Sequence, residues 1–438
     1  MGSRGVKGGP NVASVCRCEA IWALKAKRRR HFAGRDGRSW AATSSARMHP
    51  DTLAVHAGRE DLAALGVHAP PVDFSTTYPF EDLDAAVESL AELTAGGAGA
   101  ANPVYARLHG PTVARFERAL AALEGAEAAV AFASGMAAIS AVVLAARSPD
   151  RDHVVGIRPI YGSTDYLLTR RLLGPEVTWS DAAGVAASVR PDTALVVIET
   201  PVNPTLDLID ISAVVDAAGD VPVLVDSTFA TPVLQRPLLH GAAMVVHSAT
   251  KFIGGHGDVM AGVVACSEAW ARRLREVRVF TGALLHPLAG YLLHRGLPTL
   301  PLRVRRAQET AGVLAARLAM HGVVAHVHYP GLPGGDPARL IGRQMEGPGA
   351  MVAFEVAGGR EAAERLMRAL RLIGPAVSLG STDTLIQHPA GLTQRVAERA
   401  DAGAPAVSPG LLRLAVGLED AGDLWGDLES GLQSAAGA

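Results

Sequence analysis

The amino-acid sequence predicts an α/β protein with a mostly parallel central sheet, helices on both faces of that sheet and a smaller C-terminal α+β domain. Two observations indicate this fold class. Short apolar runs between residues 128 and 246 lack polar alternation and are separated by helical stretches, which is typical of parallel strands buried on both faces. From about residue 303 the pattern changes to one long helical stretch, followed by a new strand and a new helix.

An arm and a helix are expected before the sheet. Residues 48–110 have the character of an extended arm, because they contain Pro70-Pro71 and a stretch rich in glycine and alanine at 95–101. From Val113 to Leu123 the apolar residues recur at helical spacing, and Gly125 marks the end of that helix.

Four short apolar runs are expected to form strands of the central sheet. They are Ala128–Phe132, Ala194–Ile198, Pro222–Val225 and Ala243–Val246. Ligands of such sheets bind at the carboxyl ends of the strands. The residues that directly follow each run are therefore the first candidates for chemistry.

The C-terminal domain is expected to begin with a long helix at Arg303–His321. A strand at Ala350–Val356 and a helix at Glu361–Leu370 follow. We therefore predict four regions, which are an N-terminal extension at 1–47, the arm at 48–110, the central-sheet domain at 111–302 and the C-terminal domain at 303–438.

Composition and charge describe a globular protein with an unusual N-terminal extension. The chain has 438 residues, 49% of them hydrophobic and 19% charged, and no long uncharged apolar run suggests a membrane span. Its net charge of −2 hides an asymmetry, since residues 1–47 hold 11 Lys and Arg against 2 Asp and Glu, whereas the remainder holds 30 against 41. The acidic globular part does not suggest a nucleic-acid partner.

The basic N-terminal extension permits three interpretations: a basic arm, an organelle-targeting peptide, or a translated upstream stretch that precedes Met48. We favour the third and predict that this extension is disordered.

Cys16 and Cys18 have no nearby histidine or cysteine partners, so we predict no metal site. Cys266 is alone in the globular part, which rules out a disulfide framework there and favours the reducing cytoplasm.

Small and polar residues follow three of the predicted strands. The Ser134–Met136 turn precedes a helix, whose free amides could bind an anion. Asp226 follows the third run, and Lys251 comes after the fourth together with the hydroxyls of Ser248 and Thr250. Each feature alone is also common without a ligand, so the combination carries the argument.

Lys251 is the only lysine after residue 28, although the chain has many arginines. Arginine stays protonated in proteins, whereas a lysine can lose its proton and act as an amine nucleophile. An anion site, a carboxylate and a nucleophilic lysine are together the groups that bind pyridoxal 5'-phosphate (PLP). The lysine forms a Schiff base with the cofactor aldehyde, and the carboxylate keeps the pyridine nitrogen protonated.

Several motifs resemble those of the Cys/Met-metabolism (trans-sulfuration) family of fold-type-I PLP-dependent enzymes. The likeness covers residues from about 50 to 436 and is strongest with methionine γ-lyases and cystathionine γ-lyases. The motifs are YAR at 105–107, GPT at 110–112, SGMAA at 134–138, YGST at 161–164, ETPVNP at 199–204, VVHSATK at 245–251 with GGHGDV after it, SLG at 378–380 and RLAVGLED at 413–420.

This resemblance implies a PLP site. Lys251 would carry the cofactor and take the Cα proton of the substrate, Asp226 would pair with the pyridinium, and Tyr161 would stack on the ring. The remaining cofactor-binding residues implied for the same subunit are Gly135, Met136, Thr228, Ser248 and Thr250. From the arm of a neighbouring subunit, Tyr105 and Arg107 would reach the phosphate, which implies a homotetramer made of two catalytic dimers.

The resemblance also implies how a substrate is held. Asn203 and Arg413 would bind the α-carboxylate, with Ser378 nearby, because the guanidinium fork of arginine suits a carboxylate. A tyrosine, Tyr105 or Tyr161, would donate a proton to the leaving group.

The expected substrate is a sulfur-containing amino acid. Val377 precedes the SLG motif where cystathionine-handling members often have glutamate, and an apolar valine agrees better with methionine γ-lyases. Ser163 replaces the cysteine that is characteristic of those lyases, and Val279 and Phe280 stand where an acid is expected. Asp383 and Gln394 replace a usual glutamate and histidine. These four departures argue against efficient turnover of methionine itself.

Three functions remain open from the sequence. The first is γ-elimination on a substrate of the methionine, homocysteine or cystathionine type, which gives a 2-oxo acid, ammonia and a thiol. The second is γ-replacement of the cystathionine γ-synthase or O-acylhomoserine sulfhydrylase type. The third is a protein that binds PLP but serves as a scaffold.

Overall fold

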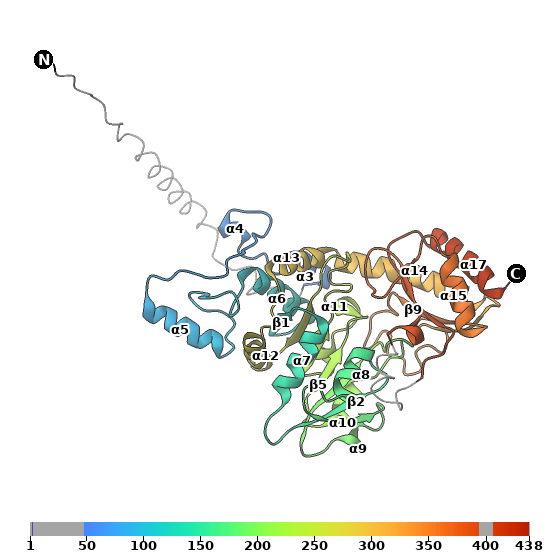
Figure 1. The fold of residues 1–438 in the computed structure, drawn as a ribbon, viewed down its shortest axis with the longest axis horizontal. Coiled ribbons are helices and arrows are strands. Elements are labelled where there is room, and N and C mark those ends of the chain that lie inside the picture. The colour runs from blue at the N-terminus through green and yellow to red at the C-terminus, as the bar shows by residue number, and fades with distance from the viewer. Residues whose placement is uncertain (1, 3–47, 394–405, 438) are drawn as a thin grey trace. The chain divides into compact units, whose positions relative to one another are not determined.

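The computed structural model describes residue 2, residues 48–393 and residues 406–437 (Figure 1). Residues His49–Ala438 form one compact unit that contains two β-sheets. Cys16, Cys18 and Gln394 lie outside the described residues. The disorder of the N-terminal extension and the division of the chain into four regions stay predictions.

The arm is not an extended segment, so that part of the prediction is wrong. It contains the helices α3 (Pro50–His56), α4 (Leu62–Leu65) and α5 (Leu83–Thr94), drawn in blue in Figure 1. Helix α5 forms because Asp82 caps it by accepting hydrogen bonds from the first two helical amides after Leu83, at 2.9 and 3.1 Å. The alanines and leucines that follow favour a helix.

The larger sheet has seven strands in the order β1-β7-β6-β5-β4-β2-β3. Their bounds are β1 Ala128–Phe132, β2 His153–Ile157, β3 Glu176–Ser180, β4 Thr193–Glu199, β5 Val223–Asp226, β6 Met244–His247 and β7 Gly262–Cys266. Strands β6, β5, β4, β2 and β3 are parallel, whereas β7 runs antiparallel to both β1 and β6. The predicted mostly parallel sheet is confirmed.

Three strands of this sheet were not predicted, namely β2, β3 and β7. Strand β2 begins with His153, whose buried imidazole is bonded to the hydroxyls of Thr193 and Thr178 at 2.8 and 2.9 Å. Strand β3 lies at the sheet edge and is only partly buried, so its sequence is polar. A strand pattern based on uninterrupted apolar runs does not detect either of them.

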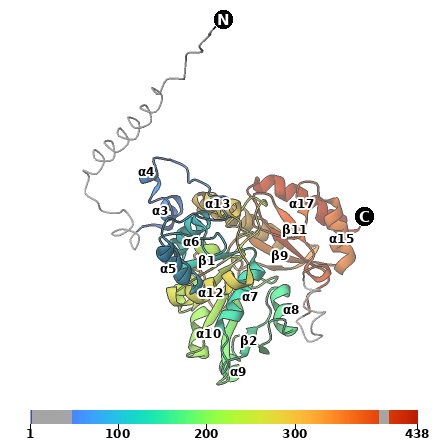
Figure 2. The ribbon, with the colours of Figure 1, turned by 60° about the vertical axis from the view of Figure 1, so that its left-hand side comes forward.

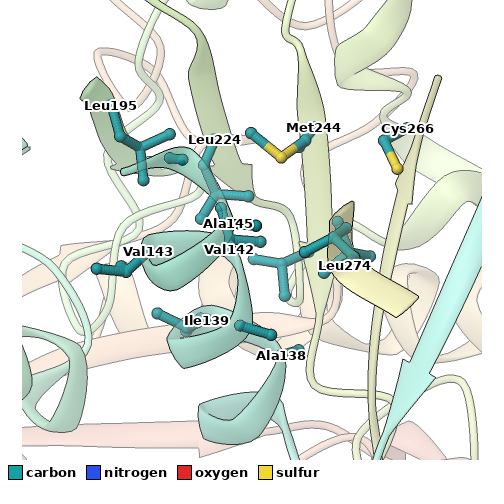
Figure 3. Close-up of a cluster of buried hydrophobic side chains, with 14 of the residues drawn as sticks. Ala138, Ile139, Val142, Val143, Ala145, Leu195, Leu224, Met244, Cys266 and Leu274 are labelled. Carbon is teal, nitrogen blue, oxygen red and sulfur yellow. The ribbon is translucent and has the colours of Figure 1, made fainter. Parts of the chain in front are cut away.

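Helices cover both faces of the larger sheet. They are α6 Pro111–Glu124, α7 Gly135–Ala146, α8 Gly162–Thr169, α9 Val185–Ser188, α10 Ile211–Ala218, α11 Thr231–Leu234, α12 Glu268–Thr281 and α13 Pro287–Gly296, with 3₁₀ turns at Pro237–His240 and Leu297–Thr299. Figure 3 shows one face, where Ile139 and Val142 of α7 and Leu274 of α12 pack against Leu224 and Met244 of the strands. Helix α10 packs on the opposite face.

The described residues of the C-terminal part form a five-stranded sheet and the helices α14, α15 and α17. The long helix α14 (Leu300–Ala319) leads into strands with the order β10-β11-β12-β9-β8. Their bounds are β8 Val324–His328, β9 Met351–Val356, β10 Gly374–Pro375, β11 Leu385–Gln387 and β12 Leu411–Ala415, and a 3₁₀ turn spans Pro389–Gly391.

Two helices cover one face of this second sheet. They are α15 (Gly359–Ala369) and α17 (Ala421–Ala436), which lie side by side in Figures 1 and 2. Leu366 of α15 and Leu428 of α17 are both buried in the same core. The predicted long helix, strand and helix of this part are confirmed. No helix among the described residues is long and apolar enough to cross a membrane.

Candidate active site

A cavity of about 570 Å³ lies at the carboxyl ends of β4, β5 and β6 and extends to the second sheet. It brings together thirteen of the fifteen site residues expected from the sequence. They are Gly135, Met136, Tyr161, Ser163, Asn203, Asp226, Thr228, Ser248, Thr250, Lys251, Val377, Ser378 and Arg413. We call this space the Lys251 cavity.

Lys251 lies one turn beyond the end of β6, with its side chain directed at the C-terminal part of the chain. Its Nζ donates a hydrogen bond to Oγ of Ser378 at 2.7 Å. Burial, assisted by the nearby charge of Arg413, lowers the pKa of Lys251 to about 8. The amine is therefore far easier to deprotonate than an exposed lysine, as a nucleophile or general base requires.

The approach of Ser378 to Lys251 depends on the glycine two residues further on. Gly380 has φ +77°, and a Cβ at that position would lie 2.5 Å from the backbone nitrogen of Phe252. Only glycine allows this contact between the two segments. Ser378 itself has φ +95°, so the SLG motif holds an unusual backbone shape that presents the serine to Lys251.

Asp226 is the last residue of β5, and its carboxylate is held from the next turn. The hydroxyl of Thr228 donates to Oδ1 of Asp226 at 2.5 Å, and the Thr228 amide donates to the same oxygen at 3.0 Å. Thr228 in turn accepts a bond from the amide of Ser248 at 2.9 Å. Burial raises the pKa of Asp226, while the bonds from Thr228 oppose that rise. A cation beside this carboxylate would offset the cost of its burial.

An anion cradle forms where α7 begins. Ser134 caps the helix by accepting a bond from the amide of Ala137 at 3.1 Å, and the first amides of a helix have no partner within it. Gly135 packs so closely on Ser248 that a Cβ there would lie 3.0 Å from the Cβ of that serine. This close approach keeps the amides open toward the cavity, as a bound phosphate requires.

Thr250 has a second role that the sequence did not suggest. Its hydroxyl oxygen lies 3.1 Å from the carbonyl oxygen of Ala261, to which it donates, and it accepts from the amide of Ala261 at 2.9 Å. The hydroxyl therefore joins the loop that carries Lys251 to the strand β7 region. The hydroxyl of Ser248 makes no such bond with the described residues. It is therefore the more available of the two hydroxyls as a donor to an anion.

Asn203 and Arg413 form a clamp on the other side of the cavity. The buried guanidinium of Arg413 donates to Oδ1 of Asn203 at 2.8 Å and to the carbonyl of Ser378 at 3.2 Å. Gln387, with its amide oxygen turned toward Arg413, accepts a further bond at 2.8 Å. Burial lowers the pKa of Arg413 to about 10, which still leaves it charged near neutral pH. This geometry suits a carboxylate ligand.

Two polar residues, Glu199 in the lining of the cavity and Gln387 beside Arg413, were not assigned a role from the sequence. Glu199 is the last residue of β4 and is 5% exposed, and Gln387 of β11 pairs in register with Arg413 of β12. Glu199 shares one signal with Asp226, since each follows a buried apolar run directly. Gln387 could not be found in that way, because only the pairing of β11 and β12 brings it to Arg413.

Tyr105 and Arg107 do not line the Lys251 cavity within one chain. They lie in a second cavity of about 360 Å³, together with Tyr78, His109 and Arg278. Arg107 donates to the carbonyl of Val279 at 3.0 Å and its guanidinium lies 5.6 Å from the ring centre of Tyr105. We call this space the Tyr105 cavity. The expected contribution of these two residues to a neighbouring subunit stays a prediction.

The substrate-side wall of the Lys251 cavity is largely apolar. Val377 and Met260 are 54% and 67% exposed, and Phe229 lies beneath the guanidinium of Arg413 at 5.6 Å. Ser163 also lines this cavity. Val279, in contrast, packs with Leu93 of the arm and does not line the Lys251 cavity. Within one chain it therefore makes no direct contact through which it could influence the substrate, as the sequence had suggested.

The described residues fit PLP as a cofactor. The open amides at the start of α7 match a phosphate, the buried carboxylate of Asp226 matches a protonated pyridine nitrogen, and the buried amine of Lys251 matches an aldehyde. These three groups converge on one cavity. Among the described residues, no cluster of three His, Cys, Asp or Glu side chains could hold a metal ion.

Comparison with known proteins identifies the family of the chain, while the roles of the individual site residues stay predictions. Residues 51–433 match the family of Cys/Met metabolism PLP-dependent enzymes. An L-methionine γ-lyase of Brevibacterium sandarakinum is 55% identical over 89% of this chain and 99% of its own length. One from Streptomyces avermitilis is 57% identical over 87% of this chain and 88% of its own length.

Solved structures share the fold. A methionine γ-lyase from Micromonospora echinospora has 37% identity and a TM-score of 0.76, over 88% of this chain and 99% of that one. A cystathionine γ-synthase from Xanthomonas oryzae pv. oryzae has 34% identity and a TM-score of 0.80, over 89% and 99%. The predicted fold class, the PLP cofactor and the enzyme class, a PLP-dependent carbon–sulfur lyase, are confirmed. The chain belongs to the Cys/Met metabolism family of PLP-dependent enzymes.

Proposed function

We propose that this enzyme catalyses the γ-elimination of L-methionine, which yields 2-oxobutyrate, ammonia and methanethiol. One observation carries the choice of substrate. The Lys251 cavity combines a carboxylate clamp, Asn203 and Arg413, with an apolar wall at Val377 and Met260, neither of which offers a charged partner for a distal amino group. The names of the two bacterial relatives support the same substrate. In our proposal this support outweighs the four departures named above, which argue against efficient turnover of methionine.

Cofactor binding is assigned to residues of four loops. In our proposal Gly135, Met136, Ser248 and Thr250 hold the phosphate, and Tyr161 packs on the ring. Asp226, oriented by Thr228, pairs with the ring nitrogen. When bound, PLP withdraws electrons from Cα and Cβ of the amino acid and so makes both of their protons acidic.

Lys251 is the proposed base for these protons. With a pKa of about 8, a substantial fraction of its amine is neutral at mildly alkaline pH. Ser378 accepts its hydrogen bond at 2.7 Å and keeps Nζ on the side of the cavity where Arg413 lies. A carboxylate held by Arg413 would place the neighbouring Cα close to this amine.

Tyr161 is the proposed proton donor to the leaving sulfur. It is the residue before α8, and its backbone is anchored by a hydrogen bond to Glu199 at 2.6 Å. Ser163 lies in the same loop and lines the cavity. A serine hydroxyl can accept or donate a hydrogen bond near the sulfur, but it is less acidic than a cysteine thiol.

We also propose that two chains form a catalytic dimer and that two such dimers form a tetramer. Tyr105 is 45% exposed, and Phe74, Phe80 and Leu83 of the arm are more exposed still. A second chain would cover these apolar side chains. Tyr105 and Arg107 of the first chain would then reach the phosphate site of the second chain. The cytoplasm is the proposed location, in keeping with the free thiol of Cys266.

The test is a panel of substrates given to the purified enzyme. We expect 2-oxobutyrate from methionine without added thiol, and slower release from cystathionine, whose distal amino group finds no partner at Val377. Release of 2-oxobutyrate only from cystathionine contradicts the proposed substrate. New thioether from O-acetylhomoserine, formed only when thiol is supplied, identifies the replacement reaction instead.

A further inference from the structure

Glu199 is a buried carboxyl group of the Lys251 cavity, and the proposed function uses only its hydrogen bond with the backbone of Tyr161. It ends β4, it is 5% exposed, and it lines the cavity. In the sheet its Cα pairs with that of Asp226, the last residue of the adjacent strand β5. Two carboxyl groups therefore lie side by side at neighbouring strand ends, which a sheet would not need for its own stability.

The Glu199 carboxyl joins two loops that approach the cavity from different strands. Its Oε2 accepts a hydrogen bond from the amide of Tyr161 at 2.6 Å, and the backbone amide of Asn203 also donates to the carboxyl. Tyr161 lies between β2 and α8, whereas Asn203 lies in the turn after β4. One side chain thus fixes the distance between these two loops.

From Asn203 the contacts continue to the reactive amine. Asn203 accepts from Arg413 at 2.8 Å, and Arg413 donates to the carbonyl of Ser378 at 3.2 Å. Ser378 accepts from Nζ of Lys251 at 2.7 Å. Glu199 therefore stands at the start of a series of contacts that ends at the proposed base.

We propose that Glu199 is a positioning residue, whose carboxyl aligns Tyr161 on the cofactor side with the Asn203–Arg413 clamp on the substrate side. The inference rests on the proposed function, because it concerns the residues assigned there to ring packing and to carboxylate binding. Burial and the neighbouring charge of Asp226 raise the pKa of Glu199 well above its usual range, and the two amide bonds and Arg413 oppose that rise. A group that serves only the fold would not need this costly environment.

Three variants test the role. Glu199→Leu keeps a similar volume but removes both acceptors, and we expect a fall of about 100-fold in kcat/KM, mainly through KM, as for misplaced positioning groups. Glu199→Gln keeps acceptor capacity without charge and should recover activity to within about tenfold of wild type, since charge-assisted bonds are roughly twice as strong as neutral ones. Asp427→Asn is the matched control.

The control is a carboxylate that also holds backbone amides but lies outside the Lys251 cavity. Asp427 accepts from the amides of Leu372 and Ile373 at 2.9 and 2.8 Å. Its replacement should lower the melting temperature while leaving KM and PLP affinity unchanged. PLP affinity, measured by titrating the apoenzyme, should fall about tenfold in Glu199→Leu, because Tyr161 loses its anchor.

A double-mutant cycle with Asn203→Ala separates positioning from general destabilisation. If Glu199 acts through Asn203, the rise of KM caused by Glu199→Leu should shrink to less than about threefold in that background. Equal effects in both backgrounds overturn the proposal, as does a Glu199→Leu enzyme with wild-type KM and PLP affinity. If wild type releases no 2-oxobutyrate from methionine, the proposed function fails, while the PLP titration still tests Glu199.

Discussion

The Lys251 cavity and the Tyr105 cavity differ in which parts of the chain build them. In the Lys251 cavity the amine, the guanidinium of Arg413 and the carboxylate of Asp226 all have partners within the chain. In the Tyr105 cavity, Arg107 donates to the carbonyl of Val279, and Tyr105 is 45% exposed. Strand ends supply much of the first cavity, whereas the arm, α6 and the residues between α12 and α13 line the second. One chain therefore assembles the Lys251 cavity without Tyr105 and Arg107.

The largest effect is expected from removing the amine of the first cavity. Lys251→Ala should lower the rate of 2-oxobutyrate release by at least about 1,000-fold, because a positioned base contributes about 10²- to 10⁴-fold and the cofactor also loses its attachment. Absorbance spectra before and after borohydride treatment monitor that attachment. Lys251→Arg serves as the control that keeps the charge, and it should be equally inactive. Activity above about a tenth of wild type would contradict the assignment.

The next effect concerns the second cavity and whether it serves another chain. Arg107→Ala should weaken PLP binding by about 10- to 100-fold, the cost of losing a charged hydrogen bond. When Arg107→Ala chains are mixed with Lys251→Ala chains, hybrid dimers should form. In each hybrid, one site combines the intact Lys251 of the first chain with the intact Arg107 of the second. At limiting PLP these mixtures should recover roughly a quarter of wild-type activity, since half of the dimers are hybrid and each has one complete site.

The recovery would show that Arg107 acts across subunits. Mixtures that are no more active than the separate variants would place Arg107 in the site of its own chain, or outside catalysis altogether. The distribution of dimers is followed by different affinity tags on the two variants, and sedimentation tests for the tetramer.

A smaller effect is expected from pH, through the protonation of the Lys251 amine. Because burial lowers the pKa of Lys251 to about 8, its neutral fraction rises with pH up to that value and then levels off. The rate at which apoenzyme captures PLP should therefore rise about tenfold per pH unit below this range. A rate that continues to rise toward pH 10 would mean that the amine is not buried as described. Stopped-flow absorbance provides the measurement.

The smallest effect is expected at the rim of the first cavity. Val377→Glu introduces a charge at a position that is 54% exposed, and exposed ion pairs contribute about 1 kcal/mol or less. The ratio of kcat/KM for cystathionine to that for methionine should therefore rise by about fivefold at most. Val377→Gln is the uncharged control and should leave the ratio nearly unchanged. An unchanged ratio in Val377→Glu would show that this residue does not contribute to the choice of substrate.

Much of the reactive centre could be predicted, because local sequence patterns coincide with strand ends. The run before Asp226 and the run before Lys251 both became adjacent parallel strands, so their following residues had to meet at one edge of the sheet. The anion cradle followed from the Ser134–Met136 turn in the same way. These predictions required only the strand type and the rule for ligand position.

The missed features depend on contacts between distant segments. Gln387 reaches Arg413 only because β11 and β12 are paired. Strand β7 (Gly262–Cys266) is an apolar run, but no local pattern shows that it lies between β1 and β6 and antiparallel to both. Helix α5 was missed because the proline and glycine around it suggested an extended arm. The second hydrogen-bonding role of Thr250 likewise depends on Ala261, eleven residues away.

By itself the sequence determined the cofactor. A single lysine, a strand-end carboxylate and a small-residue turn are local features, and together they are the groups that bind PLP. The tertiary structure decided which groups surround the lysine. It placed Ser378 and Arg413 of the C-terminal part beside Nζ, and it put Tyr105 and Arg107 in another cavity. The physical reason is that strand-end motifs are positioned by neighbouring hydrogen bonds, whereas the clamp arises from packing between segments more than a hundred residues apart.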